Sequence, residues 1–429
     1  MDPLAVRSRD HALALDAADP LRHFRDQFHF PVHPGKEGGK VIYFTGNSLG
    51  LQPKGVRAAV EQELSDWSQF GVEGHFKAKH PWYSYHERFS ESLARIVGAQ
   101  PSEVVAMNGL TVNLHLLMVS FYRPQGRRVK VLTEQRPFPS DTYAIASQIA
   151  FHGGDPEHDL VEMRPRSGEH TLRTADILSR IADLRDELAL VLFGGVNFYT
   201  GQLFNMQAIT EAAHRAGAMA GFDLAHAAGN VPLALHDWGV DMACWCSYKY
   251  LNSGPGGVAG AFVHERHHGP EVPRFAGWWG HDKVERFAMG SEFKPMASAE
   301  AWQLSNAPVL LMAPHRASLD LFDQAGMEAL IVKGRSLSSF LWHTLEAVSA
   351  SSGVGLEIIT PSAPEERGCQ LSVVVEGRGK EVHERLAAEG VVLDWREPNV
   401  LRLAPVPLYN SFEDIWRFGE LLNGILAKV

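Results

Sequence analysis

The chain has 429 residues, a length that suggests about two to three domains, or one large α/β domain with a smaller partner. With 45% hydrophobic and 21% charged residues, its composition is ordinary for a globular enzyme. Its formal net charge of −10, with no basic stretch to offset it, argues against a nucleic-acid partner. No apolar run reaches the roughly 18 residues of a membrane helix, and the three cysteines lack paired spacing, so we expect a cytoplasmic protein without a membrane partner.

The first 50 residues predict a helical arm followed by a short strand at 41–44. From about residue 90 onward, apolar strands alternate with helical stretches such as 206–216, whose apolar residues recur at three- and four-residue spacing. The expected strands of this part are 104–107, 129–132, 190–193, 218–222 and 260–263. Strands buried on both faces, with helices between them, predict a parallel or mixed α/β sheet.

The last part of the chain predicts a separate, smaller domain. After Pro314 we expect one long helix over 318–350, followed by an alternation of strands and helices. The expected division is therefore an N-terminal arm associated with the small domain (1–50), a large domain (51–315) and a small α+β domain (316–429).

Lys249 is the most informative residue, because it closes an apolar, strand-like run that begins at Met242 and is followed by a loop of small residues. Burial disfavours the ammonium form, and a neutral, positioned amine forms Schiff bases with pyridoxal 5′-phosphate (PLP). Asp223 ends a second apolar strand, and a PLP site needs such a carboxylate to keep the pyridine nitrogen protonated. A buried structural lysine paired with an acid is the alternative, but the two residues together favour a PLP site.

Three weaker signals leave alternatives open. The helix that begins after Gly109 could offer its N-terminus to a phosphate, or Thr111 could be a plain N-cap. Phe138, between two prolines, could stack on a flat ring or pack against its neighbours. Arg402 on a short apolar strand could bind a carboxylate ligand or form a structural salt bridge. No set of histidines, cysteines and acids has metal-ligand spacing, so no metal is expected.

Nine segments in chain order resemble the kynureninases, a family of the fold-type-I (aspartate aminotransferase-like) superfamily of PLP enzymes. These segments are FTGNSLG (44–50), LTVNLH (110–115), FPSD (138–141), NFYTGQ (197–202), FDLAH (222–226), CWCSYKYLN (244–252), GWWGH (277–281), LSN (304–306) and PLYNSF (407–412). The resemblance extends over nearly the whole chain and is specific because all the segments occur in order. It implies a large domain with a mostly parallel, seven-stranded sheet flanked by helices, and a smaller α+β C-terminal domain.

The resemblance also implies a cofactor, an activity and an assembly. The cofactor would be PLP, and the reaction would be the hydrolysis of L-kynurenine to anthranilate and L-alanine in tryptophan catabolism, with 3-hydroxykynurenine left open as a second substrate. The working unit would be a homodimer with shared active sites, to which Trp278 and Asn306 would come from the second subunit.

The residue roles that the resemblance implies are as follows. Lys249 would bond to PLP and move the substrate's α-proton, Asp223 would pair with the ring nitrogen, and Tyr248 would be a proton donor or only a phosphate anchor. Further cofactor contacts would be Leu110, Thr111, Phe138, Pro139, Ser140, Asp141, His226, Trp278 and Asn306. Arg402 would bind the substrate's α-carboxylate, while His75 and Asn306 would border its aromatic end. Gly194 departs from the family pattern, in which a hydroxyl residue contacts the cofactor.

Two other functions of the same fold stay open at this stage. An aminotransferase would release a keto acid, and a cysteine desulfurase would need a thiol on a mobile loop, for which Cys369 is a poor candidate because it begins an apolar strand. A PLP-binding regulator without turnover belongs to a different class, and the lack of a basic DNA-reading segment argues against it.

Overall fold

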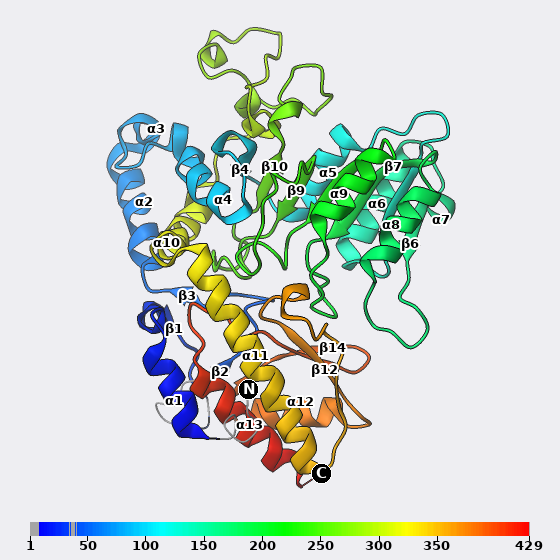
Figure 1. Cartoon of the computed structure of the whole chain (residues 1–429). Coiled ribbons are helices and arrows are strands. Elements are labelled where there is room, and N and C mark those ends of the chain that lie inside the picture. Colours follow the sequence, from blue (N-terminus) through cyan, green and yellow to red (C-terminus); the bar gives the residue numbers. More distant parts are fainter. Residues whose placement is uncertain (1–7, 34, 36–38, 40, 429) are drawn as a thin grey trace.

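The computed structural model describes residues 8–33, 35, 39 and 41–428, and it divides into a larger upper part and a smaller lower part in Figure 1. The larger part contains a seven-stranded sheet in the order β4-β10-β9-β8-β7-β5-β6. Its strands are β4 (Val104–Ala106), β5 (Lys130–Glu134), β6 (Leu160–Met163), β7 (Leu188–Gly194), β8 (Met219–Asp223), β9 (Met242–Trp245) and β10 (Gly260–Val263). Strand β10 is antiparallel to both of its neighbours, and the other adjacent pairs are parallel. The predicted α/β class with a mostly parallel seven-stranded sheet is confirmed.

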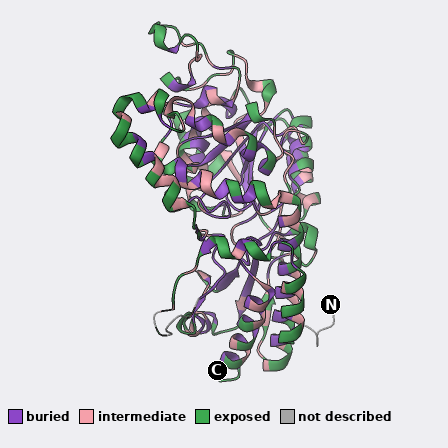
Figure 2. Cartoon of the chain, turned by 90° about the vertical axis from the view of Figure 1, so that its left-hand side faces the viewer, coloured by how far each residue is buried: buried purple, intermediate pink, exposed green. Residues whose placement is uncertain are grey.

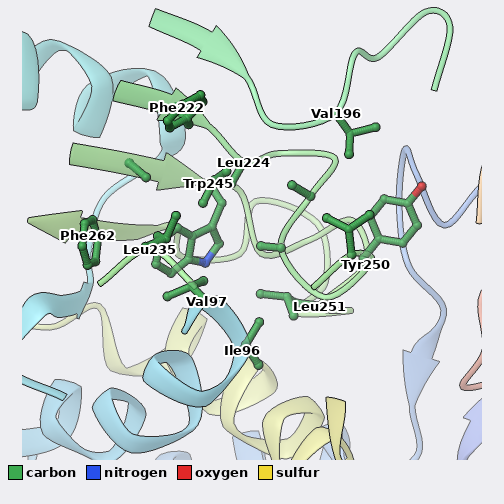
Figure 3. Close-up of a cluster of buried hydrophobic side chains, with 14 of the residues drawn as sticks. Ile96, Val97, Val196, Phe222, Leu224, Leu235, Trp245, Tyr250, Leu251 and Phe262 are labelled. Carbon is green, nitrogen blue, oxygen red and sulfur yellow. The ribbon is translucent and has the colours of Figure 1, made fainter. Parts of the chain in front are cut away.

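The large sheet is buried on both faces, and strand β9 shows how its sequence achieves this. Ala243 and Trp245 belong to one apolar core, whereas Met242 and Cys244 belong to another, because successive side chains of a strand point to opposite faces. Figure 3 shows Trp245 beside Val97 in the first of these two cores. The helices that cover the sheet include α5 (Leu110–Phe121), α6 (Pro139–Phe151), α8 (Thr174–Asp183) and α9 (Met206–Arg215). In Figure 2 the strands are coloured as buried, and exposed residues lie on the outer helices.

The smaller part contains a four-stranded antiparallel sheet with its own core. Its order is β11-β12-β15-β14, from β11 (Leu356–Ile358), β12 (Leu371–Val375), β15 (Val400–Leu403) and β14 (Asp394–Arg396). Helices α11 (Met327–Ser352), α12 (Gly379–Ala388) and α13 (Phe412–Leu426) supply much of the remaining core.

The single helix predicted over 318–350 is wrong. The structure has two helices there, α10 (Val309–Ala325) and α11, and the chain breaks between them at Gly326. Gly326 has a φ of +74°, a left-handed value that favours glycine and ends the first helix. Helix α10 packs on α2 (Val56–Phe70), while α11 packs on α13, so the break lies where the chain passes from the larger to the smaller part.

The N-terminal segment is tied to the smaller part. Helix α1 (Arg9–Ala18) packs on α13, and the Asp16 carboxylate accepts the backbone N–H groups of Phe412 and Glu413 at 2.8 and 2.9 Å. Strand β2 (Ile42–Tyr43) pairs in parallel with β13 (Val391–Val392). These contacts connect the arm to the small domain, but the division at residues 50 and 315 stays a prediction. Residues 1–7, 34, 36–38 and 40 of the arm lie outside the described part. Within that part, no helix combines the length and apolar character needed to cross a bilayer.

Candidate active site

A pocket of about 210 Å³ opens at the carboxyl ends of neighbouring strands of the large sheet. Glu134, Gly194 and Asp223 are the last residues of β5, β7 and β8, and Cys246 directly follows β9. In open α/β sheets this edge is where ligands bind, because the loops there diverge and leave a crevice. The residues that line the pocket are Leu110, Thr111, Glu134, Phe138, Ser140, Asp141, Gly194, Val196, Phe198, Asp223, Ala225, His226, Cys246, Tyr248 and Lys249.

Lys249 lies in the turn after β9, four residues beyond the end of that strand at Trp245, and not at the strand end as the apolar run suggested. Its side chain is only 9% exposed. The Nζ atom lies 3.0 Å from His226 Nε2 and 5.7 Å from the centre of the Phe138 ring. The turn is held by Ser247, whose hydroxyl bonds the Ser253 hydroxyl at 2.6 Å. The fold thus holds an amine inside the pocket, in contact with one imidazole.

His226 is neutral at physiological pH. Burial, followed by the positive charge of Lys249, lowers the pKa of its imidazole well below the usual value. A neutral imidazole can accept a hydrogen bond from the Lys249 amine through Nε2. Its Nδ1 atom is buried and has no protein partner among the described residues, so one polar atom in the pocket wall is left unsatisfied.

Asp223 and Asp141 form a carboxyl pair at the base of the pocket. Asp223 Oδ1 accepts the backbone N–H of Ala225 at 2.7 Å, which fixes the orientation of its carboxylate. Asp141, at the start of α6, hydrogen-bonds the Asp223 side chain, and its pKa is raised well above the usual value by burial and then by the negative charge of Asp223. The raised pKa favours the protonated form of Asp141, and the Asp223 carboxyl lines the pocket beside it.

Glu134 is a third acid in the pocket, and the sequence analysis missed it. Both of its carboxyl oxygens lie 3.1 Å from the backbone N–H of Gly194, and burial raises its pKa to about 7. A Cβ atom at position 194 would lie 2.9 Å from Glu134 Oε1, so the buried carboxyl fits because residue 194 is glycine. An acid at the end of an apolar strand, the same signal that singled out Asp223, could have identified Glu134.

Replacing Glu134 with glutamine should change how stability depends on pH. The folded-state pKa of about 7 lies above the ordinary value of 4.5, so between these values the folded chain holds a proton that the unfolded chain has lost. The stabilisation that Glu134 contributes is fully present below pH 4.5 and is lost as the pH rises through about 7. Between pH 4 and 8, wild type should therefore lose about 3 kcal/mol more than Glu134→Gln.

Urea unfolding of the cofactor-free chain at both pH values measures this difference. Glu162→Gln is a matched control, because Glu162 is half-exposed on the adjacent strand β6, where it pairs with Thr133 of β5. Equal pH dependence in wild type and Glu134→Gln would show that folding does not raise the pKa of Glu134 above its ordinary value.

The N-terminus of helix α5 faces the same pocket. Its N-cap is Gly109 and no side chain caps it, so the alternative in which Thr111 is a plain N-cap is wrong. Leu110 and Thr111, in the first turn, line the pocket. The free N–H groups and the positive end of a 12-residue helix favour an anion such as a phosphate at this position.

Tyr248 and Phe138 complete the walls of the pocket. Burial raises the pKa of the Tyr248 phenol, which hydrogen-bonds Cys246, so the phenol keeps its proton at neutral pH. Phe138 is 39% exposed and meets Phe198 edge-on at 5.4 Å between ring centres, and Phe198 is another residue that the sequence analysis did not single out. Ser140 contacts Asp141 through its hydroxyl, at 3.5 Å.

The remaining predicted residues lie outside this pocket in the single chain. Pro139 lines an adjoining cavity of about 680 Å³, and the Trp278 indole donates to the Arg286 carbonyl at 3.0 Å. His75 and Asn306 line one separate cavity of about 340 Å³ together with Trp82. Arg402 is buried beside the pocket, where its Nη1 atom donates to the carbonyl of Phe198 at 2.7 Å; the roles predicted for these residues stay predictions.

The pocket fits the donor requirements of PLP. Lys249 could bond to the aldehyde, the Asp223 carboxyl group could hold the ring nitrogen, and the uncapped start of α5 could hold the phosphate. The unsatisfied Nδ1 of His226 gives a further polar contact in the wall. No part of this set requires a metal ion.

Comparisons with known proteins agree with this fit. A family model described as the kynureninase C-terminal domain matches residues 330–422. The kynureninase of Flavobacterium johnsoniae is 56% identical over 423 residues, covering 98% of this chain and 99% of the relative, and that of Myxococcus xanthus is 53% identical, covering 97% of each.

Solved structures of similar fold are more distant in sequence. A C-DES mutant with glycine covalently linked to the PLP cofactor has a TM-score of 0.73 at 19% identity and covers 94% of this chain and 98% of its own. The cysteine desulfurase CsdA of Escherichia coli has a TM-score of 0.73 at 16% identity and covers 95% and 99%. At these identities the likeness establishes the fold alone.

Proposed function

The chain belongs to the kynureninase family, and we propose that it uses PLP to hydrolyse L-kynurenine, with water, to anthranilate and L-alanine. When bound, PLP supplies an electron sink that stabilises negative charge at the substrate's α-carbon. The observation that carries the proposal is the buried Lys249 amine in one pocket with the Asp223 carboxyl group and the uncapped start of α5. Relatives more than 50% identical over nearly the whole chain connect that pocket to kynurenine cleavage.

Each residue of the pocket has a proposed part in the reaction. Lys249 Nζ takes the proton that leaves the substrate's α-carbon, and neutral His226 orients the amine through the 3.0 Å contact. Asp223 is the proposed partner of the ring nitrogen, and Asp141 beside it has a raised pKa that favours its protonated form. Tyr248 Oη, protonated at neutral pH, is the proposed proton donor after the Cβ–Cγ bond breaks, and Arg402 binds the α-carboxylate.

A product assay tests the proposed function. Wild type supplied with PLP and L-kynurenine should release fluorescent anthranilate and L-alanine in equal amounts. A keto acid and an aminated cofactor in their place would indicate an aminotransferase, and no product at all would sink the proposal and favour a binding protein.

A cysteine desulfurase is disfavoured although such enzymes share the fold. Cys244, Cys246 and Cys369 are all buried and free. Burial raises the pKa of the Cys369 thiol to about 12, so a thiolate nucleophile is scarce at neutral pH. The unpaired thiols also support the cytoplasmic location that we propose, because the cytosol keeps cysteines reduced.

We further propose a homodimer with shared active sites. Large apolar side chains are exposed around His75, Trp278 and Asn306, the predicted site residues that lie outside the pocket. Exposed apolar surfaces of this kind are typical of interfaces. These side chains include Trp67, Val72, Phe76, Phe275, Trp278, Phe287, Met289, Leu310 and Leu311. The yellow-green segment that carries Trp278 extends away from the rest of the large domain in Figure 1, where it could reach a second copy.

Complementation between two inactive variants tests the shared sites. Lys249→Ala subunits mixed with Trp278→Ala/Asn306→Ala subunits should form heterodimers in which one of the two sites carries neither lesion. Each heterodimer should then have about half of the activity of a wild-type dimer, whereas either variant alone should be inactive. Subunit exchange is verified by mass labelling, and exchange without regained activity would place Trp278 and Asn306 in the site of their own subunit or in none.

A further inference from the structure

Two arginines share a single carboxylate beside the proposed active site. Asp394 and Arg396 lie on β14, and Asp394 is the direct cross-strand neighbour of Arg402 on β15. The Asp394 Oδ2 atom accepts from Nη2 of Arg402 and also from Nη2 of Arg396, the latter at 3.1 Å. A single carboxylate is therefore the acceptor for two guanidinium groups.

This cluster adjoins the pocket from the side of the small domain. Arg402 donates to the carbonyl of Phe198, which lines the pocket, and Arg396 lines the adjoining cavity of about 680 Å³. Glu134 and Phe198 line both cavities, so the two are neighbours. The positive charges of Arg402 and Arg396 both act on His226 in the pocket wall.

The donors of this cluster are not all satisfied. The Nε atoms of Arg402 and Arg396 are both buried without a partner among the described residues, and Arg402 as a whole is 1% exposed. A buried donor without an acceptor is destabilising, and two cations against one anion leave an excess positive charge. Both features point to a second anion that joins the cluster when the site is filled.

We propose that Arg396 is a positioning residue that retains Asp394 when Arg402 binds the substrate's α-carboxylate. The inference rests on the proposed function, in which Arg402 is the carboxylate-binding residue. Without Arg396, Asp394 has Arg402 as its remaining partner in the cluster, and the incoming carboxylate must displace a like charge. With Arg396 in place, each of the two carboxylates keeps a guanidinium.

Calorimetry of L-alanine binding to the PLP-loaded enzyme tests the role proposed for Arg396. L-Alaninamide, which lacks the carboxylate, is the comparison ligand. Arg396→Ala should weaken L-alanine binding about tenfold or more and leave L-alaninamide binding unchanged. In kinetics with L-kynurenine the same variant should raise KM and leave kcat nearly unchanged. Arg396→Lys, which keeps the positive charge, should recover most of the affinity.

The double variant Arg396→Ala/Asp394→Asn separates this proposal from direct contact between Arg396 and the substrate. Removing the charge of Asp394 should restore L-alanine binding to within a few-fold of wild type, because Arg402 then has no competing anion. Asp394→Asn alone should bind L-alanine at least as tightly as wild type. This single variant still tests the proposal if Arg396→Ala fails to fold. Arg385→Ala, which removes a half-exposed arginine paired with Glu381 at 2.6 Å, is the matched control.

Three outcomes would overturn the proposal. These are unchanged L-alanine binding in Arg396→Ala, a double variant as weak as Arg396→Ala, and weaker binding in Asp394→Asn. Failure of the proposed function is a separate result, because a chain that releases no anthranilate can still bind the α-carboxylate of L-alanine through Arg402.

Discussion

Replacing Lys249 with alanine is expected to lower turnover of L-kynurenine by at least about a thousandfold, because the variant loses the amine that we propose bonds to PLP and moves the α-proton. Lys249 is the amine that the structure holds in the pocket, 3.0 Å from neutral His226. Wild type treated with PLP and borohydride should carry the cofactor on the peptide that contains Lys249. The variant should carry no fixed cofactor and should release its PLP on dialysis after denaturation.

Lys333 provides the internal control for this labelling. It is 7% exposed, as buried as Lys249, but it lies in the small domain and pairs with Asp19 at 2.7 Å. Burial alone therefore predicts labelling of both lysines, whereas the proposed site predicts labelling of Lys249 only. Borohydride-fixed cofactor on Lys333, or on any other lysine peptide, would remove Lys249 from its assigned role.

The parts of the site that the sequence could predict are those set by local patterns. Asp223 and Lys249 stand out because each follows an apolar run in a strand pattern, and the strand that carries Asp223 ends at that residue. The first turn of α5 was recognisable as a helix start, although the sequence could not decide between a capped helix and a free N-terminus. Local chain geometry determines where such elements begin and end, so a single stretch of sequence is enough to indicate them.

The rest depends on which segments meet in space. Glu134 and Gly194 are 60 residues apart, and only the adjacency of β5 and β7 in the sheet brings the carboxyl onto the glycine N–H. The short strands β6, β11 and β14 have weak patterns of their own and exist because longer neighbours pair with them. Asp394 between two arginines is likewise a product of the β14–β15 register, which the sequence does not display.

Replacing Asp223 with asparagine should leave the chain folded and slow removal of the substrate's α-proton by roughly a thousandfold or more. The asparagine carbonyl can still accept the N–H of Ala225, now 2.7 Å from Asp223 Oδ1, so the local turn should persist. The variant loses the negative charge that we propose faces the ring nitrogen, and a pyridine without its proton is a poor electron sink. Exchange of the α-hydrogen of L-alanine with solvent deuterium, followed by NMR, measures the proton-transfer step apart from bond cleavage.

Asp141→Asn is the comparison that makes this test specific, because Asp141 lies against Asp223 in the same pocket but has a raised pKa, which favours its protonated form. Removing a group that is already neutral should slow exchange much less than removing the anion, so the ratio between the two variants reports which carboxyl carries the charge. Near-wild-type exchange in Asp223→Asn would refute the role given to Asp223. A larger loss in Asp141→Asn than in Asp223→Asn would transfer that role to Asp141 and reverse the assignment of the proton within the pair.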